Sequence, residues 1–168
     1  TQQQCEQAIH VAHQKLLASH PNLGLVLVGK MSNAHRKNEA YFKKKGYRNI
    51  HFTDFVQDDQ RDWLFAHCSA YVFPSLMEGF GLPGLEAMAH NTPVISSSAT
   101  CLPEIYSDAA YYFDPRDVND MTRAINDVLT NPTLRDNLVI KGSEQLKKYS
   151  WLHMAEQTHR IYINALEK

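Results

Sequence analysis

The sequence predicts an α/β fold with a doubly wound parallel sheet. Short apolar segments of strand character alternate with longer segments of helical periodicity, and the connections between them are brief. The segment over 23–29 is an almost unbroken apolar run, which is typical of a strand buried on both faces, as in a parallel sheet. The chain has 168 residues and no internal repeat or linker, so we expect a single domain with a sizeable core.

The first half of the chain contains three helices, each followed by a strand. The first helix spans 2–19 and is predicted by apolar residues at helical spacing, namely Cys5, Ile9, Ala12 and Leu16. The following elements are, in order, a strand over 23–29, a helix over 33–45 that ends at Gly46, a strand over 50–55, a helix over 58–68 and a strand over 70–73.

The second half continues the alternation and then becomes helical. A loop after 73 leads into a helix that ends near 90, and strands follow over 93–96 and 109–113. Helices are expected over 117–130, 132–148 and 151–167. Asn131-Pro132 marks the start of the second of these, and Ser150 is the predicted N-cap of the third.

The bulk composition excludes several classes of function. The net charge is −1, so nothing indicates a nucleic acid partner. No apolar stretch approaches the roughly 20 residues of a membrane span, and the polar start is not that of a secretory leader. The three cysteines, Cys5, Cys68 and Cys101, form no Cys-x-x-Cys pair, which favours a reducing, cytoplasmic setting. Thr1-x-x-Gln4 has the form of a capping box, so we expect that the chain was cut from a longer one.

The segment from Phe73 to Met88 has the features of a binding loop. It leaves a strand and enters a helix, and Pro83 suits the first helical turn. Gly79 and Gly81 permit unusual dihedral angles and close backbone approach. Free N–H groups at a helix start, with the positive end of the helix dipole, form a site for a phosphate-bearing ligand. Two carboxylates, Glu78 and Glu86, flank this loop.

The same glycines also match the dinucleotide fingerprint, as Gly79-x-Gly81-x-x-Gly84. That fingerprint directly follows the first strand of its fold and has an acidic residue about 20 positions further on. Here several residues intervene, and Ser96-Ser97-Ser98 stand where the acidic residue is expected. An NAD-binding site is therefore the weaker alternative.

A longer pattern is more specific. Seven residues separate Glu78 from Glu86, and the segments Thr92-Pro93-Val94-Ile95 and Leu102-Pro103-Glu104-Ile105 follow. This pattern closely resembles the family 4 ("group 1") retaining glycosyltransferases, whose C-terminal domain carries a Glu-x7-Glu motif. The resemblance runs from about residue 21 to the end of the chain and includes Asp114-Pro115 and Tyr149-Ser150-Trp151.

The resemblance implies an architecture and an activity. Enzymes of this family have the GT-B arrangement, in which two Rossmann-like domains face each other across a cleft and the C-terminal one binds the nucleotide sugar. Residues 1–168 would then form a single Rossmann-like donor domain of a longer enzyme and be inactive alone. The donor would be a UDP- or GDP-sugar. The acceptor would be a saccharide or a lipid-linked saccharide in polysaccharide biosynthesis, bound through the other domain, with a peripheral contact at the cytoplasmic face of the membrane.

The resemblance also assigns roles to residues. Glu86 would accept hydrogen bonds from the ribose hydroxyls, because a carboxylate can hold a vicinal diol with both oxygens. Glu78 would contact the transferred sugar beside the developing oxocarbenium charge, without acting as a nucleophile, since retention is attributed to same-face attack. The remaining donor-binding residues would be Phe55 at the base, Gly29 beside the nucleotide, and the backbone of Gly79, Phe80, Gly81 and Leu82 at the diphosphate. No Asp-x-Asp triplet occurs, so neither a metal nor another cofactor is expected.

Three features depart from the family pattern. The family has a strand and an Arg/Lys pair just before the first helix, and this sequence has neither. By the usual strand order that strand is central, so a lost N-terminal half or another chain would have to supply it. Gly29-Lys30-Met31 replaces a Gly-x-Gly, and Asp54 stands at the position of a glycine.

Other residues have simpler interpretations. A basic stretch is expected to be a solvated helix face, with contact to a lipid headgroup or phosphorylated acceptor as the alternative; it comprises Arg36, Lys37, Lys43, Lys44, Lys45 and Arg48. His10 and His13 form a helical pair that is expected at the surface rather than on a metal. The rival to an enzyme is a degenerate, non-catalytic Rossmann-like module.

Overall fold

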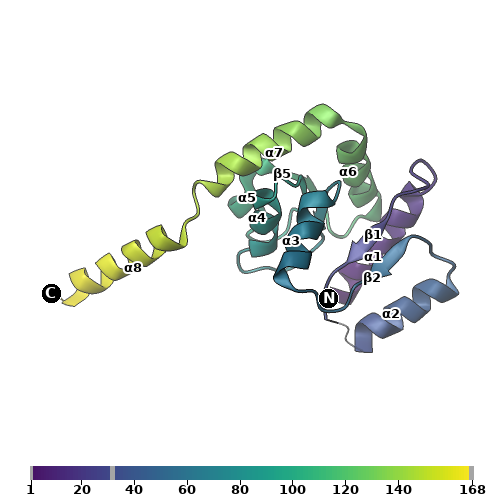
Figure 1. Cartoon of the computed structure of the whole chain (residues 1–168), viewed down its shortest axis with the longest axis horizontal. Helices are drawn as coiled ribbons and strands as arrows, with labels where there is room; N and C mark the ends of the chain where they lie inside the picture. The colour runs from purple at the N-terminus through teal and green to yellow at the C-terminus, as the bar shows by residue number, and fades with distance from the viewer. Residues whose placement is uncertain (1, 31–32, 167–168) are drawn as a thin grey trace.

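The computed structural model describes residues 2–30 and 33–166 (Figure 1). Helices and strands alternate in the order that the sequence predicts, with shorter strands and one additional helical segment, α5 with η1, near 102–109. The elements are α1 (Gln2–Leu16), β1 (Leu25–Leu27), α2 (Asn33–Lys44), β2 (Ile50–Phe52), α3 (Asp58–His67), β3 (Tyr71–Phe73), α4 (Leu82–Ala89), β4 (Val94–Ser97), α5 (Leu102–Tyr106), η1 (Ser107–Ala109), β5 (Ala110–Phe113), α6 (Val118–Thr130), α7 (Pro132–Leu146) and α8 (Trp151–Leu166).

The strands form two parallel sheets. β1 pairs with β2, and the register places Leu25 opposite Ile50. The second sheet has the order β3-β4-β5, with Val72 opposite Ile95. Within the described residues, no strand pairs with both β1 and β3. This agrees with the sequence analysis, which predicts that the central strand of the doubly wound sheet is absent.

One hydrophobic core connects the two sheets. Leu25 of β1 and Val72 of β3 both pack against a cluster that contains the buried residue Ile95 of β4. The inner face of α1 supplies Ile9, Ala12 and Leu16 to this cluster, as its helical spacing predicts, and α1 packs closely on α6. Side-chain burial therefore holds β1 beside β3 although no backbone hydrogen bond joins these two described strands.

A second core lies beneath the loop between β3 and α4. It contains buried residues of α4 and α5, including Leu85, Met88, Leu102 and Tyr106. Gly142 of α7 permits the close approach of Met88, because a Cβ at this glycine would lie about 3.1 Å from the Met88 side chain. The start of α4 thus rests on a packed layer and is not a free surface loop.

Two expectations about burial are wrong. The segment around β1 is not buried on both faces, since Val26 is 44% exposed; β1 belongs to a narrow two-stranded sheet with one edge unpaired in the described chain. His10 and His13 are not at the surface but are both buried. The His10 ring stacks on Phe42 of α2 with 3.7 Å between ring centroids, and His13 Nε2 lies 3.0 Å from the carbonyl of Leu23.

The last helix, α8, extends away from the body of the domain (Figure 1). Its start agrees with the sequence, because the N–H of His153 donates to the Ser150 hydroxyl at 3.3 Å. Its exposed large apolar residues are Trp151, Leu152, Met154, Ile161, Tyr162, Ile163 and Leu166. Among the helices of the described residues, none combines the length and the apolar character that crossing a bilayer requires.

The N-cap of α6 offers a test of this arrangement. The Asp117 carboxylate accepts from the N–H groups of Asn119 at 2.8 Å and Asp120 at 3.3 Å. We expect Asp117→Ala to lower the free energy of unfolding by about 1 kcal/mol, because the first turn loses its acceptor, as measured by urea denaturation. Asp136→Ala, an exposed position within α7, is the matched control and should change it by less than about 0.5 kcal/mol. Equal losses in both variants would contradict the capping role.

Candidate functional site

The two predicted carboxylates both follow β3 in the chain and both affect one tyrosine of that strand. Glu78 is half-buried in the loop after β3, and Glu86 is exposed on α4. Both carboxylates act on the side chain of Tyr71 in β3. The pKa of the Tyr71 hydroxyl is raised first by burial and then by the negative charges of Glu78 and Glu86. The loop and α4 therefore place two carboxylates within electrostatic range of one half-buried tyrosine, after a strand whose carboxyl end is where parallel α/β folds bind ligands.

The two loop glycines differ in what the backbone requires. Gly81 has φ +94°, the left-handed conformation, and is the N-cap of α4. A Cβ there would also collide with the side chains of Tyr106 and Leu102. Gly79 has neither restriction, because its φ is not positive and open space surrounds it. The expected need for an unusual dihedral angle thus holds for Gly81 and not for Gly79.

The backbone N–H groups at the start of α4 have no hydrogen-bond acceptor within the described residues. In the described chain, none of the N–H groups of Gly79, Phe80, Gly81 and Leu82 donates to a protein acceptor. No side chain caps the helix at Gly81, and the next available donor, Gly84 N–H, is already bonded to the Gly81 carbonyl at 3.2 Å. Uncapped donors at the positive end of a helix suit an anion, and the anion site that the sequence predicts stays a prediction.

Three side chains that the sequence analysis did not assign hold the loop carbonyls. The Ser97 hydroxyl donates to the Ser75 carbonyl, and the Cys101 thiol donates to the Glu78 carbonyl at 3.3 Å. The buried Tyr106 hydroxyl donates to the Gly81 carbonyl. In addition, Thr100 Oγ1 accepts from the Glu78 N–H at 3.2 Å. A sequence signal existed only in the polar run at 96–98, which interrupts an otherwise apolar strand.

Arg61 of α3 is a further residue near the site. Its guanidinium donates to Asp58 and Asp62, each at 3.1 Å. Its pKa is raised, first by the hydrogen bond to Asp62, and the charge of Glu86 contributes as well. Asp62 in turn lies 3.6 Å from Nε2 of His90, which follows α4. Cationic Arg61 thus lies within electrostatic range of Glu86.

The residues predicted to meet the base and the nucleotide lie on the other sheet. Phe55, after β2, is 68% exposed, and Gly29 follows β1. Asp54 adopts φ +61°, so it takes the conformation that its glycine counterpart allows, and its Oδ1 accepts from the Phe55 N–H at 2.9 Å. No hydrogen bond or ring contact in the described chain joins Phe55 or Gly29 to the Glu78 loop. The side chain of Phe80 instead packs edge-on against Tyr149, with 5.5 Å between centroids.

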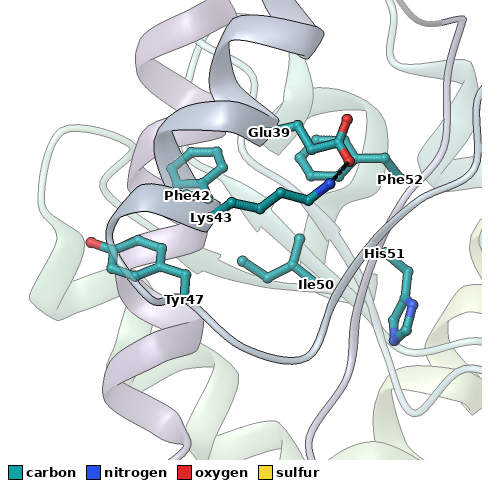
Figure 2. A pocket seen from close by; sticks show the side chains of 7 residues that line it. All are labelled: Glu39, Phe42, Lys43, Tyr47, Ile50, His51 and Phe52. Atoms are coloured by element: carbon teal, nitrogen blue, oxygen red, sulfur yellow. Dashed lines mark ion pairs between the residues drawn. The ribbon is translucent and has the colours of Figure 1, made fainter.

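Two hollows of the surface lie away from this loop. Figure 2 shows a hollow of about 210 Å³ between α2 and β2, lined by Phe42, Tyr47, Ile50, Phe52, His51 and the Glu39–Lys43 ion pair. Another, of about 470 Å³, lies along α3 and is lined by Val56, Asp59, Gln60, Trp63 and Leu64. Only the second borders a predicted site residue, since Val56 follows Phe55 in the chain.

The described residues contain no group of three or more His, Cys, Asp or Glu side chains that could hold a metal ion. The expectation of metal independence stays a prediction, because that observation concerns the protein groups alone. The basic stretch that includes Arg36 and Lys37 is exposed on and after α2, as the sequence predicts for a solvated helix face.

Comparison with known proteins assigns the family. The sequence model of the glycosyl transferases group 1 matches residues 2–145. The chain belongs to this family. It is 37% identical over 113 residues to "O-antigen chain mannosyltransferase B" of Escherichia coli, covering 67% of this chain and 30% of that protein. It is 32% identical over 123 residues to "MMP alpha-(1->4)-mannosyltransferase" of Mycolicibacterium hassiacum, covering 71% of this chain and 30% of that protein. The chain thus spans less than a third of these relatives.

Solved structures support the same fold for this group 1 domain. The sucrose-phosphate synthase of Thermosynechococcus elongatus superposes with a TM-score of 0.87 at 22% identity, over 99% of this chain and 43% of that one. The C-terminal domain of a group 1 glycosyl transferase, LpcC from Francisella tularensis, superposes with a TM-score of 0.76 at 24% identity, over 88% and 80%. The Rossmann-like α/β architecture is therefore shared with proteins of low sequence identity.

A pair of glycine substitutions tests the packing under the loop. At Gly84 an added Cβ would overlap the ring of Tyr106, whereas at Gly79 it would meet open space. We expect Gly84→Ala to reduce the free energy of unfolding by about 1–3 kcal/mol through overpacking, and Gly79→Ala to change it by less than about 0.5 kcal/mol. Urea denaturation measures both. A Gly84→Ala variant as stable as Gly79→Ala would show that Tyr106 does not pack there.

Proposed function

We propose that this domain binds the sugar nucleotide of a retaining, metal-independent glycosyltransferase. The observation that carries the proposal is the row of backbone N–H groups from Gly79 to Leu82, none of which has a protein acceptor in the described chain. These donors lie at the positive end of α4 and between two carboxylates, Glu78 and Glu86. An anionic diphosphate flanked by two hydroxyl-bearing sugars matches such a site.

The same donors explain how bond cleavage is assisted. In glycosyl transfer from a sugar nucleotide, negative charge develops on the leaving diphosphate. Preoriented N–H groups stabilise that charge without reorganisation, and the helix dipole adds to their field. In this proposal they supply the stabilisation that a divalent cation gives to other sugar-nucleotide enzymes, so the reaction proceeds without a metal or a cofactor.

The carboxylates then have separate roles. Glu86, exposed on the second turn of α4 and close to the charge of Arg61, accepts from the two ribose hydroxyls. Glu78, half-buried in the loop, contacts hydroxyls of the transferred sugar and stabilises positive charge at its ring. Attack comes from the face of the departing diphosphate, so Glu78 forms no covalent intermediate. Phe55 and Gly29 border the base and the nucleotide from the neighbouring sheet.

The names of the relatives support a proposal for the donor sugar and for the acceptor. Those compared above are named as mannosyltransferases, so we propose a mannosyl donor first, carried by GDP or UDP. The acceptor would be a saccharide or lipid-linked saccharide in polysaccharide biosynthesis. It would be bound by a second Rossmann-like domain in a GT-B arrangement at the cytoplasmic face of the membrane. This proposal treats residues 1–168 as one half of an enzyme and expects no turnover from that half alone.

Ligand-dependent stability tests the donor site. We expect GDP or UDP and their sugar conjugates to raise the melting temperature of the full-length enzyme by mass action, with a smaller rise or none in this chain alone. Glu86→Ala should weaken nucleotide binding about ten-fold, the loss expected for hydrogen bonds to a charged group, while Glu156→Ala, exposed on α8, should not. Stabilisation by NAD instead would favour the oxidoreductase alternative. No nucleotide effect in either protein would favour the non-catalytic module.

Steady-state kinetics separate the role of Glu78 from that of Glu86. We expect Glu78→Ala in the full-length enzyme to lower kcat by about 100-fold or more with little change in the donor KM, because its interaction strengthens as charge develops. Glu86→Ala should mainly raise the donor KM. Initial rates over a range of donor concentrations distinguish the two patterns, and unchanged kinetics in both variants would refute the site.

A further inference from the structure

We propose that Tyr106 is a positioning residue, whose buried hydroxyl fixes the Leu82 N–H toward the diphosphate of the donor. This inference rests on the proposed function and adds to it a residue outside the Glu-x7-Glu segment. Tyr106 is the last residue of α5, its side chain is fully buried, and it lies 25 positions from the carbonyl that it holds.

The contact between Tyr106 and the loop is close and specific. Its hydroxyl donates to the carbonyl of Gly81. The ring occupies the space where Cβ atoms of Gly81 and Gly84 would otherwise be, so both glycines are needed for the hydroxyl to reach the backbone. Burial raises the pKa of this hydroxyl well above its usual range. The group therefore stays protonated and remains a donor at neutral pH.

The planarity of the peptide bond converts this contact into an orientation. The carbonyl of Gly81 and the N–H of Leu82 belong to one trans peptide unit, so they point in opposite directions. Because Tyr106 holds the carbonyl toward the buried core, the Leu82 N–H must point away from it. Leu82 itself is 43% exposed and has no acceptor for its N–H in the described chain, as expected for a donor that faces a ligand.

A similar arrangement occurs three residues earlier in the loop, at the peptide unit that joins Glu78 and Gly79. The Cys101 thiol donates to the Glu78 carbonyl at 3.3 Å, which turns the N–H of Gly79 the opposite way. A thiol is a weak donor, whereas the Tyr106 hydroxyl is a strong one in a dry environment. We therefore assign the larger share of the orientation to Tyr106.

Removal of one hydroxyl tests the proposal, and the fold supplies a matched control. Tyr106→Phe deletes the buried bond to Gly81, while Tyr112→Phe deletes an exposed hydroxyl-to-carbonyl bond, from Tyr112 to Ser107 at 2.6 Å. Both variants lose one hydroxyl-to-carbonyl hydrogen bond, so both should be destabilised. Only Tyr106→Phe should affect the donor site. Calorimetric titration of the full-length enzyme with GDP, UDP and the corresponding nucleosides gives the readout.

We expect Tyr106→Phe to lower the affinity for the nucleoside diphosphate that the wild type binds by about ten-fold. The affinity for the corresponding nucleoside should be unchanged. Tyr112→Phe should leave both affinities as in the wild type. Equal diphosphate affinity in the two variants, or equal losses for nucleoside and diphosphate in Tyr106→Phe, would overturn the positioning role. A wild type that binds no nucleoside diphosphate would instead overturn the proposed function, which is a separable result.

Discussion

Burial of apolar side chains between two separate sheets is the constraint on which this domain depends. β1 and β3 share no backbone hydrogen bond, yet Leu25 and Val72 pack into the same cluster, with α1 and α6 covering it. Apolar burial is non-directional, so it can hold strands side by side without a ladder. The position of every loop at the carboxyl edge, including the Glu78 loop and the segment of Phe55, follows from that packing.

The loop from Pro74 to Gly81 is held by the opposite kind of interaction, namely a few directional hydrogen bonds from neighbouring side chains. Side chains of Ser97, Cys101 and Tyr106 donate to three loop carbonyls, those of Ser75, Glu78 and Gly81 respectively. These carbonyls are satisfied by the protein, and so is the Glu78 N–H, which donates to Thr100 Oγ1, whereas the N–H groups from Gly79 to Leu82 have no acceptor in the described chain. Such an arrangement is stable without a ligand because these acceptors are paired, while Gly79, Phe80 and Leu82, whose N–H groups have no acceptor, are exposed residues.

The sequence predicted what is local and missed what is tertiary. The helix start at Pro83, the glycine at position 81 and the N-cap at Ser150 are decided by neighbours in the chain, and they lie where the sequence places them. The absent central strand was also foreseeable, from the family resemblance together with the usual strand order. Burial of His10 was not, because it depends on Phe42 of a different helix. The role of Tyr106 was equally hidden, since nothing near it in sequence identifies Gly81 as its partner.

The divided sheet also has a mechanical consequence. A continuous hydrogen-bonded sheet transmits displacement stiffly, whereas two blocks joined by side-chain contacts can slide by small amounts, as packed elements do in shear motions. Gly29 and Phe55 belong to one block and Glu78 and Glu86 to the other. We therefore expect the distance between these two groups to vary more than distances within either sheet. A strand inserted between β1 and β3 would join the two sheets by hydrogen bonds. It would then fix the distance between the Gly29 and Phe55 side and the Glu78 and Glu86 side, which a ligand in contact with both would have to span.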